Sequence, residues 1–364
     1  MKILFVLENY FPHIGGVETL FDNLARELSK NDHEVVVLTT LKNSSDKAFE
    51  KIGNITIHRK SYGNRYLFTI LAFFSAFKLS KNCDLIHTTS YNAALPAWLA
   101  GRCRNKKVVI TFHEVWGELW FKLPFMSKFG ARLHYMFEQM LLELSFHKFV
   151  AVSKYTQQAL IAEGVSADNI EMIYNGIDYK EFDSIMHTPS KTDFTFTFFG
   201  RLGMSKGIEL YLEAISLMSN LRSDVKFQLI IPTQPKPFLD DINALIDQLD
   251  IRKRIQIKHN LTFTQLQNTI AGSNAIVIPS HSEGFCFAAV ETMAIGTPII
   301  SSAKGALKEV VSGKHLTMQT FDSAGLKKCM DLAISGEWNF IPNRKFLLSD
   351  TVNKYISLYR ESLT

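Results

Sequence analysis

The chain has 364 residues, of which 46% are hydrophobic and 21% charged, an ordinary globular composition that excludes a disordered or fibrous protein. This length predicts two domains, or one large one. The four cysteines include no C-x-x-C pair, which argues against a disulfide framework and a structural zinc site and favours a reducing, intracellular setting.

The net charge of +5 is unevenly distributed. Residues 59–132 hold twelve Lys and Arg against three Asp and Glu, which gives +9 and leaves −4 for the rest of the chain. Such a concentration predicts an anionic partner near the first half. No secretory signal is expected at the N-terminus, and the longest apolar run, 66–77, is too short to span a membrane.

Short apolar runs that predict buried strands alternate with helical patterns along the chain. In the first half, strands are expected at 2–7, 34–39, 85–87, 107–111 and 149–152, with a helix at 17–30. In the second half, strands at 195–200, 226–231, 255–258 and 275–279 alternate with helices at 207–218, 238–248 and 264–271. Continuous apolar strands between amphipathic helices predict parallel sheets covered on both faces.

We therefore expect an α/β protein of two doubly wound, Rossmann-like domains. The predicted boundaries are 1–182 for the first domain, 183–193 for a polar linker and 194–345 for the second domain, followed by a terminal segment at 346–364. Ligands of such sheets bind at the carboxyl ends of the strands, so the expected site is the cleft between the domains.

Two motifs in the first half lie where a strand should end. Gly15-Gly16-Val17-Glu18 precedes the first helix, where glycine lets backbone N–H groups approach a ligand, although a plain tight turn also explains it. His113 follows the strand at 107–111 and could donate to a substrate oxygen, or simply be a satisfied loop histidine. The G-x-G-x-x-G dinucleotide fingerprint is absent.

Two further motifs lie in the second half. Arg201 and Lys206, with Gly200 and Gly207 beside them, could clamp a pyrophosphate, or be two solvated cations. Glu283 precedes a predicted helix that contains Glu291, about 12 Å further at helical rise, which roughly matches the separation of sugar and ribose in a nucleotide sugar. The intervening amides of Gly284, Phe285, Cys286 and Phe287 would point at a phosphate.

These residues carry a resemblance to the family-4 retaining glycosyltransferases of the GT-B fold. The matching motifs are G-G-V-E at 15–18, V-S-K-Y at 152–155, N-G-I-D at 175–178, F-G-R-L-x-x-x-K-G at 199–207 and the specific block E-G-F-x-F-x-x-x-E-T-M-A-x-G-T-P-I-I at 283–300. The segment 346–363 resembles the family's last helix, which packs back on domain one. Cys286 stands where glycine is common, and the patterns after 305 and 313 are incomplete.

The resemblance implies a role for each residue. Arg201 and Lys206 would bind the donor diphosphate, Glu291 the ribose and Glu283 the donor sugar. His113 would contact the sugar near the reacting carbon, and Gly15 and Gly16 would let the first loop approach the ligands. The implied reaction is retaining, metal-independent transfer of a hexosyl residue from a UDP- or GDP-linked hexose, without a cofactor, in surface polysaccharide, lipopolysaccharide or glycolipid synthesis.

Two aromatic segments raise the question of a membrane. The run 66–77 is interpreted as a core helix of the first domain, whereas 115–136 interleaves aromatic and basic residues as an interfacial surface does. The residues expected to face a membrane are Trp116, Trp120, Phe121, Lys122, Phe125, Lys128 and Arg132. We therefore expect a cytoplasmic protein that binds the inner face of the cell membrane, with a lipid-linked saccharide as acceptor and no nucleic acid partner.

Two alternatives stay open at this point. A nucleotide-sugar epimerase would share the fold, and a catalytically silent subunit would share the ancestry. The combination of Arg201, Lys206, Glu283 and Glu291 argues against both, and the missing fingerprint argues against a dinucleotide oxidoreductase.

Overall fold

A computed structural model describes the chain except for residues 14, 43–45, 124–125, 191 and 219–223. Contacts divide the chain into two compact units. Unit 1 consists of Met1–Lys122, Met126–Gly176 and Leu347–Thr364, and unit 2 of Ile177–Phe346 together with Leu123. Each unit is built around its own α/β sheet.

Within the described residues of unit 1, eight strands form one sheet in the order β3-β4-β2-β1-β5-β6-β7-β8. Their bounds are β1 Lys2–Val6, β2 Glu34–Thr40, β3 Phe49–Ile52, β4 Ile55–Lys60, β5 Leu85–Thr89, β6 Lys107–Phe112, β7 Lys148–Ala151 and β8 Ile170–Met172. Neighbours pair in parallel except at the β3–β4 hairpin, which is antiparallel. The predicted strands are present and the expected parallel sheet is confirmed for them; the β3–β4 edge was not predicted, and its short connection allows only antiparallel pairing.

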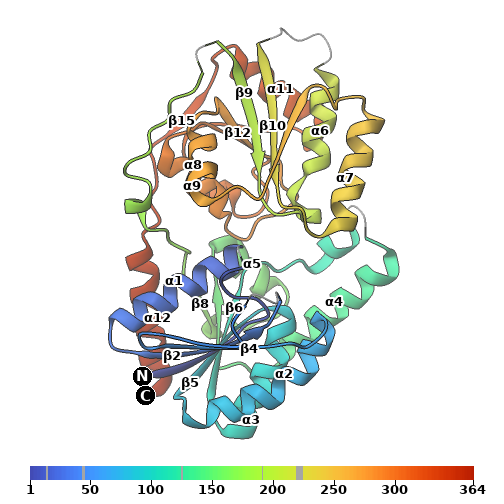
Figure 1. The fold of residues 1–364 in the computed structure, drawn as a ribbon. Helices are drawn as coiled ribbons and strands as arrows, with labels where there is room; N and C mark the ends of the chain where they lie inside the picture. Colours follow the sequence, from blue (N-terminus) through green and yellow to red (C-terminus); the bar gives the residue numbers. More distant parts are fainter. Residues whose placement is uncertain (14, 43–45, 124–125, 191, 219–223) are drawn as a thin grey trace. The chain divides into compact units, whose positions relative to one another are not determined.

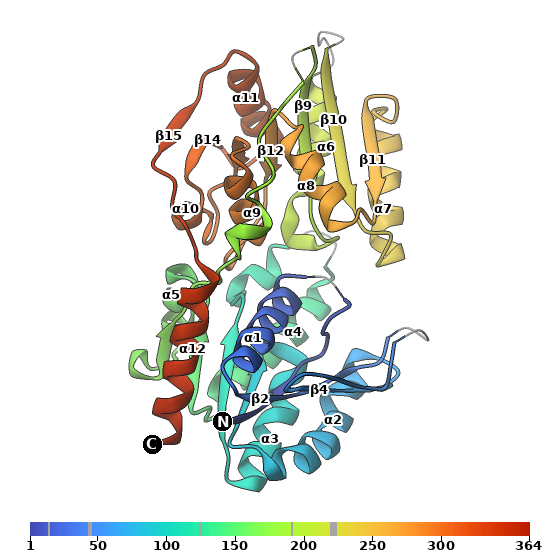
Figure 2. The same cartoon turned by 60° about the vertical axis from the view of Figure 1, so that its left-hand side comes forward.

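Helices cover this sheet (Figures 1 and 2). Their bounds are α1 Gly16–Lys30, α2 Arg65–Leu79, α3 Ala94–Arg104, α4 Lys128–Glu143, α5 Lys154–Ala162 and α12 Leu348–Leu363. Polar side chains fix several helix starts by accepting backbone N–H bonds, namely Asn64 for α2, Ser127 for α4 and Ser153 for α5. No helix among the described residues is long and apolar enough to cross a membrane.

The C-terminal helix α12 packs against α1 and belongs to unit 1 (Figure 2). Its Tyr359 hydroxyl lies 2.6 Å from Nδ1 of His87 on β5, and its Tyr355 hydroxyl lies 3.0 Å from Oγ1 of Thr111 on β6. Thr111 Oγ1 in turn lies 2.8 Å from Nε2 of His87. Burial lowers the pKa of His87 to about 3, so a neutral imidazole joins the last helix to the sheet.

In the described part of unit 2, seven strands form the order β11-β10-β9-β12-β13-β14-β15. The strands are β9 Phe194–Phe199, β10 Val225–Ile231, β11 Ile255–His259, β12 Ala275–Ile278, β13 Ile299–Ser301, β14 Gly313–Thr317 and β15 Asn339–Ile341. The helices are α6 Ile208–Leu217, α7 Lys236–Gln248, α8 Phe263–Ala271, α9 Phe287–Ile295, α10 Leu307–Val310 and α11 Ser323–Ile334. All pairs are parallel except β14–β15.

Candidate functional site

The predicted donor residues of unit 2 lie at the carboxyl ends of two neighbouring strands. Arg201 follows β9, and Lys206 ends a short 3-10 turn, Met204–Lys206, ahead of α6. Glu283 follows β12, which pairs with β9. Parallel strands bring these connections to one edge of the sheet, which is where ligands of such sheets generally bind. That a ligand binds here in this chain stays a prediction.

Lys206 and Glu283, which are 77 positions apart, form a bidentate ion pair. The Lys206 ammonium donates to both carboxylate oxygens of Glu283, at 2.8 and 2.9 Å. The hydroxyl of Ser280 donates to one of the same oxygens at 2.8 Å. Glu283 is only 6% exposed, so its carboxylate is held in one orientation before any ligand binds.

Two glycines permit this arrangement. Gly207 has φ +67°, and a Cβ there would lie 2.1 Å from the carbonyl oxygen of Pro279. Gly305 has φ +60°, and its Cβ would lie 2.3 Å from the carbonyl oxygen of Glu283. Any larger residue would push apart the connections that carry Lys206 and Glu283.

Helix α9 begins directly after this pair. Cys286 is the N-cap of α9 and has φ +80°. Glycine adopts this left-handed conformation most easily, which explains why it is common at this position in the family-4 glycosyltransferases that the sequence resembles. Burial, followed by the charge of Glu283, raises the pKa of the Cys286 thiol well above its ordinary value, so the thiol stays neutral. Phe285 is buried and Phe287 half-buried, and their rings meet edge to face.

Glu291 lies on α9, half-buried. Burial raises the pKa of its carboxyl to about 7, with a smaller contribution from the charge of Glu181. A carboxyl that titrates near neutrality can accept hydrogen bonds from hydroxyls when ionised and donate one when protonated. Arg201 is exposed, and Gly200 beside it is half-buried, so the guanidinium can reach a ligand in solution.

The predicted residues of unit 1 gather at the start of α1 and the end of β6. Gly15 is the N-cap of α1 and Gly16 its first residue. His113 is half-buried, and its ring centroid lies 6.5 Å from that of Phe21 on α1. Glu18 in the first turn is 3% exposed, and its Oε2 has no hydrogen-bond partner among the described residues.

The residues predicted to face a membrane divide into two groups. Phe121, Lys122, Lys128 and Arg132 are exposed, whereas Trp116 is half-buried and Trp120 only 6% exposed. Assigning Trp120 to a membrane surface is therefore wrong, because its indole N–H donates to the buried carboxylate of Glu138. Phe125 lies outside the described residues.

Glu138 is a residue that the sequence patterns did not single out. It is fully buried and accepts four hydrogen bonds, from the Tyr91 hydroxyl, the backbone N–H groups of Trp116 and Gly117, and the Trp120 indole. It holds the segment that follows His113. Glu181 and Gly305 were also missed, because each acts on a residue distant in sequence, Glu181 on Glu291 and Gly305 on Glu283. Ser280 was missed although it bonds Glu283 only three positions away. No group of three metal-ligating His, Cys, Asp or Glu side chains occurs in the part of the chain described here.

Two family models match the chain, "Glycosyltransferase Family 4" over residues 14–181 and "Glycosyl transferases group 1" over residues 180–338. An uncharacterized glycosyltransferase of Methanocaldococcus jannaschii is 26% identical over 86% of this chain and 83% of its own length. A GDP-mannose:cellobiosyl-diphosphopolyprenol alpha-mannosyltransferase of Xanthomonas oryzae is 25% identical over 83% of this chain and 78% of its own.

Solved structures share the fold. Sucrose-phosphate synthase from Thermosynechococcus elongatus superimposes with a TM-score of 0.83 at 20% identity, covering 99% of this chain and 98% of its own. HepE of Anabaena, in complex with UDP and glucose, gives 0.78 at 18% identity with both chains fully covered. With two matched family models in sequence over 14–338 and a GT-B architecture, the chain belongs to glycosyltransferase family 4 and is an enzyme that transfers a sugar from a nucleotide-sugar donor.

Proposed function

We propose that this enzyme transfers a hexosyl residue from a UDP- or GDP-linked hexose to a glycan or lipid-linked saccharide, with retention of anomeric configuration and without a metal ion. The observation that carries the proposal is the bidentate ion pair of half-buried Lys206 with buried Glu283 at the carboxyl edge of the unit 2 sheet. The pathway we propose is surface polysaccharide or glycolipid assembly, lipopolysaccharide included.

The pair fits both halves of a donor. Glu283 accepts hydrogen bonds and is suited to sugar hydroxyls, while Lys206 is a point charge suited to the diphosphate. Arg201 supplies a second, planar cation, and the start of α9 supplies backbone N–H groups for the same phosphates. Together these groups stabilise the negative charge of the departing nucleotide, which is the work of a metal ion in other enzymes.

Glu291 is assigned to the ribose hydroxyls, and His113 and Gly16 of unit 1 to the donor sugar and the acceptor. In the proposed mechanism the leaving phosphate, and not a side chain, accepts the proton of the acceptor hydroxyl. The bond between anomeric carbon and phosphate oxygen breaks as the bond to the acceptor oxygen forms, and the nucleoside diphosphate leaves with the proton.

A thermal-shift screen against UDP, GDP, ADP, CMP and dTDP, with and without EDTA, tests the donor assignment. A nucleotide held at 100 times its Kd adds about 2.7 kcal/mol of stability. We expect one base to stand out and EDTA to change nothing. Lys206→Ala should weaken binding of that nucleotide by more than about 1.5 kcal/mol, the lower end for a charged hydrogen bond. Glu283→Ala should abolish most turnover, and near-normal kinetics in both variants would refute the site.

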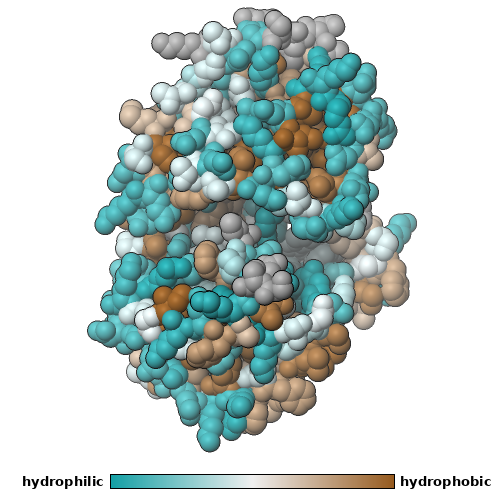
Figure 3. Space-filling view, in the orientation of Figure 1, coloured by the Kyte–Doolittle hydropathy of each residue, from teal (hydrophilic) through white to brown (hydrophobic). Residues whose placement is uncertain are grey.

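The lipid-linked acceptor is supported by two exposed apolar helix faces in unit 1. On α2, Tyr66, Ile70 and Phe74 are 65%, 65% and 66% exposed, while the opposite face packs in the core. On α4, Phe129 and Met136 are 75% and 57% exposed. Interpreting α2 as simply a core helix is therefore only half correct. Figure 3 shows brown side chains over both helices.

Basic side chains border these faces. Arg65 and Lys78 are exposed on α2, and Lys128 and Arg132 on α4. Both helices also bond the same short segment, through Thr69 to Asn92 and Glu138 to Tyr91. Apolar side chains bordered by cations suit an anionic bilayer surface, where each cation adds roughly 1 kcal/mol. We propose that α2 and α4 bind the membrane that carries the acceptor.

Co-sedimentation with vesicles tests this surface. We expect binding to vesicles containing 30% phosphatidylserine at low salt and little binding to pure phosphatidylcholine. Ile70→Asp and Phe129→Asp should each reduce binding at least tenfold, whereas Ile161→Asp, at a 45% exposed position on α5, is the matched control. Equal sedimentation of all variants would overturn the membrane surface and leave the donor site untouched.

A further inference from the structure

A cavity of about 210 Å³ opens in unit 1 beside the connection between β1 and α1. Its walls come from three places: Tyr10, Phe11 and Pro12 on that connection, helix α1, and the β3–β4 hairpin with the segment before it. The volume is smaller than the roughly 300 Å³ at which sites for drug-sized ligands begin, and it suits a single sugar ring.

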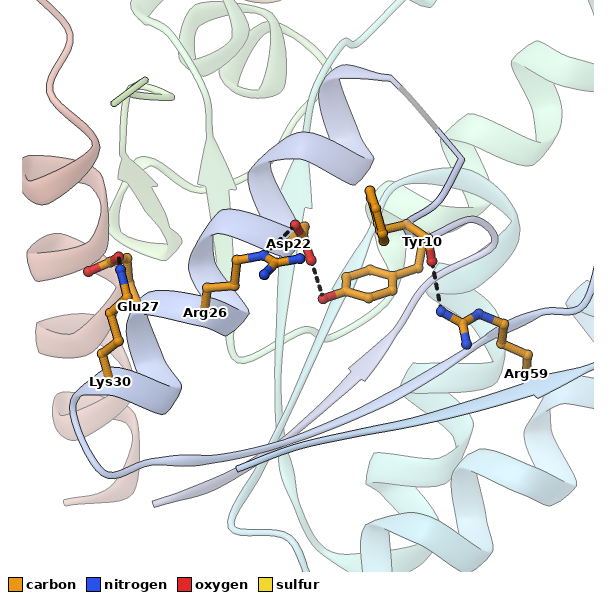
Figure 4. Close-up of polar contacts among 7 residues, drawn as sticks. Tyr10, Asp22, Arg26, Glu27, Lys30 and Arg59 are labelled. Carbon is orange, nitrogen blue, oxygen red and sulfur yellow. Dashed lines mark hydrogen bonds and ion pairs between the residues drawn. The ribbon is translucent and has the colours of Figure 1, made fainter. Parts of the chain in front are cut away.

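Polar groups are fixed around the cavity by mutual contacts (Figure 4). The Tyr10 hydroxyl donates to Asp22 at 2.9 Å, and Arg26 donates to the other oxygen of Asp22 at 2.7 Å. On the other side, Arg59 of β4 donates to Glu50 at 2.9 Å and to the carbonyl oxygen of Phe11 at 2.9 Å. Donors and acceptors are thus held in place on opposing walls.

Arg59 has a hydrogen-bonding group that these contacts do not use. Its side chain is 4% exposed, and its buried Nε has no partner among the described residues. Because solvent does not reach this N–H, a ligand in the cavity would not reach it either, and its contacts would come from the accessible groups of the lining. Arg59 also holds the hairpin to the β1–α1 connection, so a ligand here would contact both.

The charge around the cavity is balanced. Among the described residues that line it, three cations (Arg26, Lys47, Arg59) face three carboxylates (Asp22, Asp46, Glu50). A phosphate or other anion would need a surplus of cations, whereas an uncharged polyol needs both donors and acceptors. Three isoleucines and Phe11 add apolar surface for the C–H face of a sugar ring.

We propose that this cavity binds an uncharged hexose unit of the acceptor saccharide. The proposal rests on the proposed transferase function, because the β1–α1 connection leads into Gly16, the first residue of α1, which is assigned to the acceptor. It goes further in placing one sugar ring of the acceptor against Asp22, Arg26 and Ile52 and in excluding a charged sugar at that position.

Saturation-transfer NMR with p-nitrophenyl hexosides in the gluco, galacto and manno series tests the cavity. Ile52 lines it and is 45% exposed, so Ile52→Trp should fill the space without disturbing the core. We expect at least one glycoside to bind the wild type, and both Ile52→Trp and Arg26→Ala to weaken it at least tenfold. Ile161→Trp, an equally exposed position on α5, should bind as the wild type does.

Three results would overturn the proposal: no glycoside binds the wild type, Ile52→Trp and Arg26→Ala bind as well as Ile161→Trp, or inorganic phosphate competes for the site. Nucleotide thermal shifts, measured on the same samples, separate this failure from failure of the transferase assignment. A normal nucleotide shift without glycoside binding refutes only the cavity, whereas loss of the nucleotide shift in the wild type refutes the donor site.

Discussion

Glu291 is expected to destabilise the enzyme above neutral pH, and Glu291→Gln should remove that effect. Burial raises the pKa of this carboxyl from 4.5 to about 7. Between these two values the folded protein keeps a proton that the unfolded chain has lost. The free energy of unfolding therefore falls as the pH rises through this window, and the loss is complete above pH 7.

The size of the effect follows from the shift. At 1.36 kcal/mol per pKa unit, a displacement from 4.5 to about 7 corresponds to about 3 kcal/mol. Glutamine cannot ionise, so Glu291→Gln should gain up to this amount at pH 8 relative to pH 4.5. For a unit of this size, about 3 kcal/mol corresponds to a rise in Tm of roughly 6–12 °C.

The measurement is the difference in Tm between wild type and Glu291→Gln, from pH 4.5 to 8. Glu337→Gln, at an exposed position of unit 2, is the matched control and should show no pH-dependent difference. The gain in stability should be accompanied by weaker nucleotide binding at pH 8, because glutamine offers one oxygen to the ribose instead of two. A Tm difference that is constant with pH would show that the Glu291 carboxyl titrates normally and would refute this reasoning.

Two further substitutions test how the sites are held. Glu138→Gln should lower stability by more than about 3 kcal/mol in urea unfolding, since at least two N–H donors lose a charged acceptor, whereas Glu118→Gln, exposed nearby, should change little. Gly207→Ala should reduce both nucleotide affinity and stability, because the new Cβ would clash with the Pro279 carbonyl. The matched control is Gly336→Ala, which is also at positive φ but faces open space; it should lower the free energy of unfolding by only about 1–2 kcal/mol and leave nucleotide affinity unchanged.

The strands and helices that could be predicted from the sequence are those in which the pattern of apolar side chains indicates which faces are buried. Central strands such as β1 and β9 are continuous apolar runs because helices cover both faces. The edge strands β3 and β15 were missed, since they are short, largely exposed and defined by backbone pairing with a neighbour. The side chains of three or four exposed residues form no hydropathy pattern from which backbone pairing with a neighbouring strand could be predicted.

In the two aromatic segments, 66–77 and 115–136, the sequence pattern likewise could not show which side chains are exposed. Helix α2 is apolar on nearly every side, so its periodicity could not show that Phe68 is buried while Ile70 is exposed. Trp120 belonged to a convincing aromatic and basic pattern, yet a carboxylate 18 positions away places it in the interior. Arg59 was counted in the basic segment 59–132, but it is buried and paired with Glu50, so it adds nothing to a basic surface.

The Lys206–Glu283 pair shows why separate sequence motifs could predict side chains that lie together at the proposed donor site. Each residue was identified from its own motif, at the end of a different strand, and the parallel pairing of those strands brings the two side chains within 2.8 Å. The contact explains their chemistry better than either motif alone. Because the buried carboxylate already orients the ammonium, Lys206 loses less side-chain freedom when a diphosphate arrives, and its charge is in place as the bond to the sugar breaks.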